Sequence, residues 1–216
     1  MTTRLATRRV EKPWGREKLP PGFDACEGER IGEIWFESPP ALDALLVKYL
    51  FTSDKLSVQV HPPGARGKEE CWLVVEAEPG AVLGVGFREE LGPQAMRAAA
   101  LDGSIEQLLD WHPVAAGDFI YLPAGTVHAI GGGVSLIEVQ QNSDVTYRFY
   151  DYGRPRTLHL DEAVAVANGA PHDPALRGKV PGEGHVSLVR GPFFRLDRAE
   201  GPPDAALAER YDGPLL

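Results

Sequence analysis

The sequence has little cysteine and no long apolar run. Only two cysteines, Cys26 and Cys71, occur among its 216 residues. Two cysteines do not make the disulfide framework of a small secreted domain. No apolar run approaches the roughly 20 residues that a bilayer-spanning helix needs, and the N-terminus lacks the apolar region of a signal peptide. We therefore expect a cytoplasmic protein that has no membrane partner.

Positive charge is also scarce. The chain has 22 Lys and Arg against 31 Asp and Glu, which gives a formal net charge of −9. This balance argues against nucleic acid or an anionic membrane as a partner. It does not exclude a small phosphorylated ligand, because a few local cations can override the overall sign. The length leaves room for one domain, or one and a half, and for a sizeable core.

The stretch Leu-Ser-Val-Gln-Val-His-Pro at 56–62 alternates polar and apolar residues. Side chains along a strand point to opposite faces with a period of two. Ser57, Gln59 and His61 therefore share one face, and the intervening apolar residues share the other. An amide and a histidine two residues apart are half of a metal site. A strand that faces solvent is the alternative interpretation of this pair taken alone.

Two later stretches can complete such a site. Lys-Glu-Glu-Cys-Trp at 68–72 leads into an apolar run, and Pro-Ala-Gly-Thr-Val at 123–127 forms a tight turn before His128. A histidine at the entry to a strand is how small β-barrels of the cupin type present a metal ligand. If the fold brings the three stretches together, Glu70 and His128 join Gln59 and His61 as four possible metal ligands. Nitrogen and oxygen ligands of this kind suit zinc, iron or manganese.

The rest of the chain is rich in strand patterns bounded by Gly, Pro, Asp and Ser. The expected strands cover residues 33–37, 45–51, 56–61, 71–76, 81–87, 114–121, 127–139, 146–151, 186–189 and 193–196. Residues 88–111 differ and predict a small helical insertion, in which Ser104 and Gln107 fit a capping box. A further short helix is expected to begin at the cap residue Asp161.

Several motifs occur in a recognisable order: Glu-Lys-Pro-Trp-Gly, Ser-Val-Gln-Val-His-Pro, Lys-x-Glu-Cys-Trp, Pro-Ala-Gly-Thr-Val-His-Ala-Ile and Gln-Gln-Asn-Ser-Asp-Val-Thr-Tyr-Arg-Phe-Tyr-Asp-Tyr-Gly-Arg. Over roughly residues 10–167 the chain resembles the type I mannose-6-phosphate isomerases, in particular their short bacterial branch. The resemblance implies an all-β cupin jelly-roll barrel with a helical insertion (about 88–111) and a shortened second β unit. We therefore predict a cupin catalytic domain over 1–168 and a truncated C-terminal β segment over 169–216.

The resemblance also implies a reaction and a cofactor. The reaction interconverts mannose 6-phosphate and fructose 6-phosphate by moving a proton between C2 and C1 through an enediol. The substrate is thus a phosphorylated hexose. Zinc is the usual metal of the family, one per chain, and its ligands would be Gln59, His61, Glu70 and His128. The ligand types alone leave another divalent transition metal open.

Five further residues match functional positions of the family. Arg148 matches the catalytic arginine, whose fixed charge would stabilise the enediolate. Glu138 and Lys68 both match active-site positions, and the sequence does not decide which of them moves the proton. A metal-bound water or a histidine stays open as a further alternative. Ser57 and Arg154 are the candidates for binding the phosphate.

The remaining ionisable residues lack a supporting motif. Lys48 and Arg156 are interpreted as surface or structural residues. The histidines outside the motifs are interpreted as structural or exposed, namely His112, His159, His172 and His185.

Two other functions compete with the isomerase. One is a non-catalytic sugar-phosphate-binding or regulatory cupin that keeps the metal site, which the shortened C-terminus favours. The other is a metal-dependent cupin oxygenase, which fits the glutamine ligand and the Arg148 stretch poorly. A homodimer is expected by analogy with other cupins.

Overall fold

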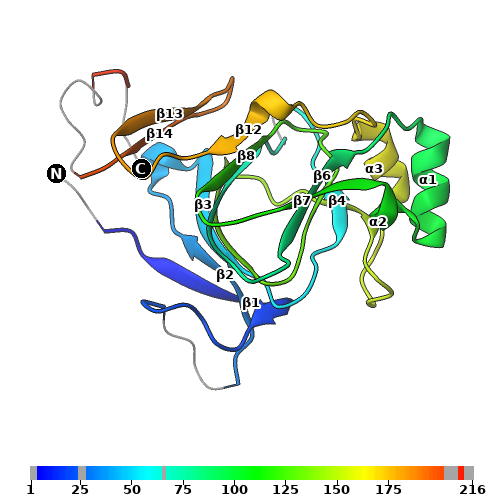
Figure 1. The fold of residues 1–216 in the computed structure, drawn as a ribbon, viewed down its shortest axis with the longest axis horizontal. Helices are drawn as coiled ribbons and strands as arrows, with labels where there is room; N and C mark the ends of the chain where they lie inside the picture. Colours follow the sequence, from blue (N-terminus) through cyan, green and yellow to red (C-terminus); the bar gives the residue numbers. More distant parts are fainter. Residues whose placement is uncertain (1–3, 24–27, 65–66, 202–208, 212–216) are drawn as a thin grey trace.

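Alternating apolar residues build two antiparallel sheets and a separate hairpin (Figure 1). The computed structural model describes residues 4–23, 28–64, 67–201 and 209–211. The seven-stranded sheet has the order β1 (Thr7–Arg16), β2 (Ile31–Phe36), β3 (Leu45–Phe51), β10 (Val134–Gln141), β5 (Glu70–Ala77), β8 (Asp118–Leu122), β12 (Arg177–Lys179). The five-stranded sheet has the order β11 (Tyr147–Tyr150), β4 (Val58–Val60), β9 (His128–Ile130), β6 (Val82–Phe87), β7 (Leu109–Pro113). The hairpin pairs β13 (His185–Arg190) with β14 (Arg195–Ala199). The prediction of an all-β jelly roll is confirmed.

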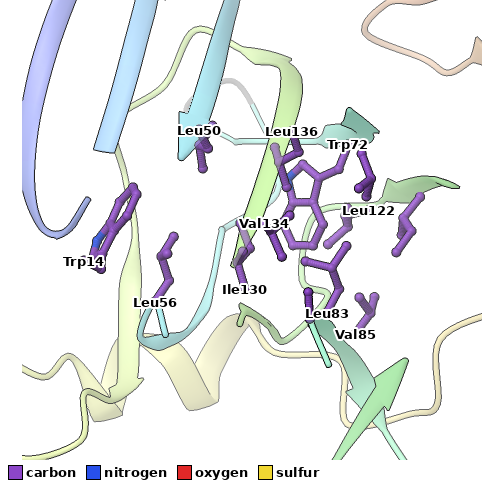
Figure 2. Close-up of a cluster of buried hydrophobic side chains, with 13 residues drawn as sticks. Trp14, Leu50, Leu56, Trp72, Leu83, Val85, Leu122, Ile130, Val134 and Leu136 are labelled. Atoms are coloured by element: carbon purple, nitrogen blue, oxygen red, sulfur yellow. The ribbon is translucent and has the colours of Figure 1, made fainter. Parts of the chain in front are cut away.

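The main core lies between the two sheets. Trp72 from β5 packs with Leu122 and Leu136 of its own sheet and with Leu83 and Val85 of the opposite one (Figure 2). Burying each of these large apolar side chains contributes about 1.5–3 kcal/mol. The face of the seven-stranded sheet that carries Trp72 is therefore the inner face of the barrel.

The outer face of the same sheet is covered by the C-terminal hairpin. Cys71 packs there with Phe119, Val139, Val189 and Phe194. The predicted opposite orientation of Cys71 and its neighbour at 70 is thus confirmed, and Cys71 is a buried free thiol. The other cysteine lies outside the described residues. The boundary between residues 168 and 169 stays a prediction, and β12, from beyond it, extends the seven-stranded sheet beside β8.

Among the residues that the structure describes, three α-helices lie beside the five-stranded sheet (Figure 1). They are α1 (Pro93–Asp102), α2 (Ile105–Leu108) and α3 (Leu160–Val166), and two short 3₁₀ helices occur at Pro40–Leu42 and Pro174–Leu176. Met96, Ile105 and Ala163 from the helices pack on Phe87 and Phe149 of the sheet. Within the described parts of the chain, no helix combines the length and hydrophobicity that crossing a membrane requires.

Local details of the helices differ from the sequence predictions. Ser104 is itself helical and makes no side-chain cap, because its backbone carbonyl accepts the N–H of Gln107 at 2.9 Å instead. The cap residue of α3 is His159, not Asp161, and its side chain also makes no cap. Strand β7 begins at Leu109, inside the predicted insertion.

Candidate active site

Three side chains from separate strands converge at one point inside the barrel. The possible ligand atoms of His61, Glu70 and His128 all lie within 4.8 Å of one another. Nε2 of His61 is 3.5 Å from Oε2 of Glu70, and Nε2 of His128 is 3.5 Å from Oε1 of the same carboxylate. All three residues are at most 2% exposed. His61 follows β4, Glu70 begins β5 and His128 begins β9, so the sheet pairing brings together residues far apart in sequence.

Backbone carbonyls fix both imidazole rings. Nδ1 of His61 lies 2.9 Å from the carbonyl oxygen of Val145, and Nδ1 of His128 lies 2.8 Å from that of Thr126. Each Nδ1 therefore carries the proton that is donated to a carbonyl. Each Nε2 is left as a lone pair directed at the cluster, which is the arrangement that metal-binding histidines use.

Gln59 lies beside this cluster. In the antiparallel register it stands opposite His128, and its Nε2 is 3.3 Å from Nε2 of that ring. Its Oε1 accepts a hydrogen bond from Oγ of Ser57 at 3.0 Å. Ser57, Gln59 and His61 are thus on one side of the strand, as the alternation predicted. A 180° turn of the amide would exchange its oxygen and nitrogen and direct Oε1 at the cluster.

The two histidines are held neutral. Burial, and then the nearby Lys68 ammonium, lower the pKa of His61 well below its usual value. Burial also lowers the pKa of His128, although Glu70 partly opposes that shift. A neutral imidazole is the form that binds a metal ion, so burial prepares the pair for coordination.

Lys68 and Glu138 both reach the cluster. Nζ of Lys68 lies 2.7 Å from Oε2 of Glu70, 3.2 Å from Nε2 of His61 and 3.4 Å from Oε1 of Glu138. Oε2 of Glu138 accepts a hydrogen bond from the Trp72 indole at 3.0 Å. Burial opposes the charge of Glu138, but lysine neighbours at 48 and 68 outweigh it and lower its pKa to about 2.

Lys48 was interpreted from sequence as a surface or structural residue, but it is 6% exposed and lies in the wall of the site. Its Nζ is 2.9 Å from Oε1 of Glu138 and 3.7 Å from Oε1 of Glu33. Glu33 is buried as well. The sequence signal for both residues was a single charge in an otherwise apolar strand pattern.

A cavity of about 210 Å³ leads away from the cluster. Its walls include the predicted site residues Ser57, Gln59, Lys68, Glu138 and Arg148. They also include residues outside the prediction, among them Lys12, Trp14, Glu33, Trp35, Lys48, Gln140 and Arg156. Five cationic side chains line this cavity, namely Lys12, Lys48, Lys68, Arg148 and Arg156. The protein is acidic overall, yet this cavity is suited to an anionic ligand.

The two arginines of the cavity are held differently. Arg148 stands opposite Gln59 in the β11–β4 register, and its buried Nε has no hydrogen-bond acceptor among the described residues. Arg156 donates to both oxygens of Asp151, with NH2 at 2.7 Å from Oδ1. Arg156 is therefore a cation of the site that sequence reasoning had set aside.

Arg154 is placed away from the cavity walls. Its NH2 group lies 3.2 Å from Oδ1 of Asp151 and donates to the carbonyl oxygen of Lys55 at 2.5 Å. Its guanidinium also stacks over Tyr152, 5.3 Å from the ring centroid. Its role in binding phosphate stays a prediction.

The remaining histidines do not reach the cluster. His172 is buried, and its Nε2 donates to the carbonyl oxygen of Tyr121 at 2.9 Å. His112 pairs with Asp110 at 3.1 Å and contacts Arg177. Both are structural residues, as the sequence indicated.

The sequence and the fold were compared with those of known proteins. No family model matches the chain. The sequence is 39% identical over 184 residues to mannose-6-phosphate isomerase from Streptococcus mutans, an alignment that covers 76% of this chain. Over three quarters of its own length the chain is therefore similar in sequence to a mannose-6-phosphate isomerase. It spans about half the length of this relative, 57%.

Solved structures of mannose-6-phosphate isomerases share the fold. The enzyme from Bacillus subtilis aligns with a TM-score of 0.74 at 26% identity, over 89% of this chain and 78% of its own. A zinc-bound mannose 6-phosphate isomerase aligns with a TM-score of 0.67 at 16% identity, over 90% of this chain and 82% of its own. The second likeness bears on the fold alone.

Proposed function

We propose that this chain is a metal-dependent aldose–ketose isomerase that interconverts mannose 6-phosphate and fructose 6-phosphate. The observation that carries the proposal is the convergence of two imidazole Nε2 atoms and one carboxylate at the end of a cation-lined cavity. Kinship with named mannose-6-phosphate isomerases supports the substrate. His61 and His128, the most buried of the described histidines, thus lie beside the charged residues that line the cavity.

The residues present fit a zinc ion. His61, Glu70 and His128 supply two nitrogens and a carboxylate, and Oε2 of Glu70 has no hydrogen-bond donor of suitable geometry among the described residues. Gln59 would supply the fourth ligand through Oε1. One zinc per chain is proposed, and when bound it would polarise the sugar carbonyl and orient its hydroxyls.

Proton transfer between C2 and C1 is assigned to the pair formed by Glu138 and Lys68. Glu138 is held as a carboxylate, which is the form that accepts a proton. Lys68 is held as the neighbouring donor, 3.4 Å away. Their mutual contact allows a proton taken from one carbon to be returned to the other without release to water. The Arg148 guanidinium, whose Nε has no acceptor in the part of the chain that the structure describes, would stabilise the enediolate oxygen.

Binding of the substrate phosphate is assigned to a hydroxyl and to a guanidinium that line the cavity. Ser57 keeps its predicted role. Arg156 lines the cavity and offers a planar guanidinium that suits phosphate. Arg154 would contribute by holding Asp151, to which Arg156 is also bound.

A coupled assay of mannose 6-phosphate conversion, on chelator-treated protein with and without added zinc, tests the proposal. We expect turnover to be lost on chelation and restored by zinc, and to be absent in His61→Ala and Glu70→Ala. Zinc binding without turnover would instead support the alternative, a sugar-phosphate-binding cupin that has lost catalysis. That outcome would overturn the isomerase.

The location and the oligomeric state are also part of this proposal. A cytoplasmic location and a homodimer are proposed by analogy with metabolic cupin enzymes. Light scattering on the purified chain tests the dimer, and a monomeric mass would reject it.

A further inference from the structure

A row of alternating charges crosses the inner face of the seven-stranded sheet. Neighbouring strands contribute Lys12 from β1, Glu33 from β2, Lys48 from β3 and Glu138 from β10, and the row ends at Lys68 and Glu70 of the metal cluster. Successive charged atoms lie between 2.7 and 3.7 Å apart. The row begins at a partly exposed lysine and ends at a metal ligand.

The two carboxylates on either side of Lys48 are held in the same way. Oε2 of Glu138 accepts the indole N–H of Trp72 at 3.0 Å, and Oε2 of Glu33 accepts the indole N–H of Trp35 at 2.8 Å. In both residues Oε1 is the oxygen that faces the Lys48 ammonium. Lys48 is therefore clamped between two carboxylates that are each anchored by a tryptophan.

This arrangement distinguishes Glu33 from an ordinary buried ion-pair partner. A buried ammonium with one partner would move fully onto that partner, because an uncompensated buried charge is costly. With Glu33 in place, the Lys48 ammonium has two carboxylate neighbours, Oε1 of Glu138 at 2.9 Å and Oε1 of Glu33 at 3.7 Å. A carboxylate oxygen has two lone pairs, so Oε1 keeps one beyond its contact with Lys48, and Glu138 lines the cavity.

We propose that Glu33 is a positioning residue of the isomerase, which holds Lys48 so that Oε1 of Glu138 remains available for proton transfer. The consequence for catalysis rests on the proposed function. Glu33 itself is not assigned contact with the reacting carbons. Its contacts are with Lys48, Lys12 at 3.2 Å and Trp35.

The kinetic test is Glu33→Gln, which keeps an acceptor for the Trp35 indole and removes the charge. We expect kcat to fall about tenfold or more, because small misplacements of a reacting group cost at least that much. KM and zinc affinity should stay within twofold, and Glu33→Asp should recover part of kcat. The control is Glu76→Gln. It removes a carboxylate that lies 3.3 Å from the Arg16 guanidinium and does not line the cavity. A kcat for Glu33→Gln within twofold of the parent would overturn the proposal.

A second measurement does not depend on turnover. Glu33 and Glu138 both act on Lys48, so the loss of unfolding free energy in Glu33→Gln/Glu138→Gln should exceed the sum of the single losses. In the Lys48→Met background, which has no shared cation, the two losses should add. Additive losses in both backgrounds would reject the shared clamp. If the parent chain fails to isomerise mannose 6-phosphate, the proposed function fails, while this cycle still decides whether Glu33 positions Lys48.

Discussion

Lys48 and Glu138 stand directly opposite each other on β3 and β10, and their charged atoms are 2.9 Å apart in the barrel interior. Burial disfavours both charges, yet each is retained because the other compensates it. The pair also connects the wall of the cavity to His61, Glu70 and His128 through Lys68. Stability and chemistry therefore depend on the same side chains.

Lys48→Met should destabilise the protein by about 3 kcal/mol, because it leaves buried carboxylates without their shared cation. Urea unfolding of the chelated protein measures this loss. Lys179→Met serves as the control, since it removes an exposed lysine 3.4 Å from Asp118. That exposed pair should contribute about 0–1 kcal/mol. Equal losses in the two variants would contradict the buried pair's role.

Acid should remove the contribution that Glu138 makes to the free energy of unfolding. Its pKa is lowered to about 2 in the folded protein from an ordinary value of 4.5. A lowered folded pKa gives stability that is present above the ordinary value and is lost as the pH falls toward the folded one. The difference in unfolding free energy between parent and Glu138→Gln should thus be constant near pH 7 and shrink between about pH 4.5 and pH 2. The exposed Glu89→Gln is the control, and a gap that is unchanged at pH 3 would refute the assignment.

Zinc should raise the unfolding midpoint of the chelated protein, because the ligand atoms converge only in the folded state. At a free zinc concentration 100 times the dissociation constant, linkage gives about 2.7 kcal/mol. Differential scanning calorimetry with and without zinc measures the shift. His61→Ala should abolish it and His185→Ala, on the exposed hairpin, should keep it. A shift that survives His61→Ala would place the zinc elsewhere.

Arg148→Met should lower kcat by about 100-fold, which is the usual loss when one donor to a developing oxyanion is removed. Burial, and then Arg156, lower the pKa of Arg148, but a guanidinium remains charged at neutral pH. The coupled isomerase assay measures the effect. Arg97→Met, on the surface of α1, should leave kcat unchanged. A loss confined to KM would instead assign Arg148 to phosphate binding.

Gly86→Ala should lower the free energy of unfolding more than Gly80→Ala does. Both glycines have positive φ, 70° and 84°, so both substitutions are strained. A Cβ at Gly86 would also lie 2.5 Å from the backbone nitrogen of His172, whereas one at Gly80 meets nothing within 4 Å. We expect the difference to exceed about 1 kcal/mol in thermal unfolding. Equal effects would show that the backbone near His172 relaxes freely.

One strand face of the site could be predicted from the sequence because it follows from strand periodicity, whereas the roles of Arg148, Glu138 and Lys68 followed from the resemblance to a family. The alternation at 56–62 places Ser57, Gln59 and His61 on one face, and any strand of that sequence would do the same. The same rule separated Cys71 from Glu70. Local helix signals were less reliable. Ser104 has the sequence of a cap, but its own N–H binds the Asp102 carboxylate at 2.8 Å and its backbone is helical.

The sequence by itself determined which side chains share a strand face and which residue types suit a metal ion and a phosphate. Only the tertiary structure decided which strands are neighbours. Lys48 and Glu33 are single charges in apolar strands, and nothing local distinguishes an exposed edge position from an inward one. The sheet order β2-β3-β10-β5 places Lys48 between Glu33 and Glu138. Pairing between distant strands, rather than local preference, thereby turned two isolated charges into part of the site, because a buried charge persists only where the fold supplies its partner.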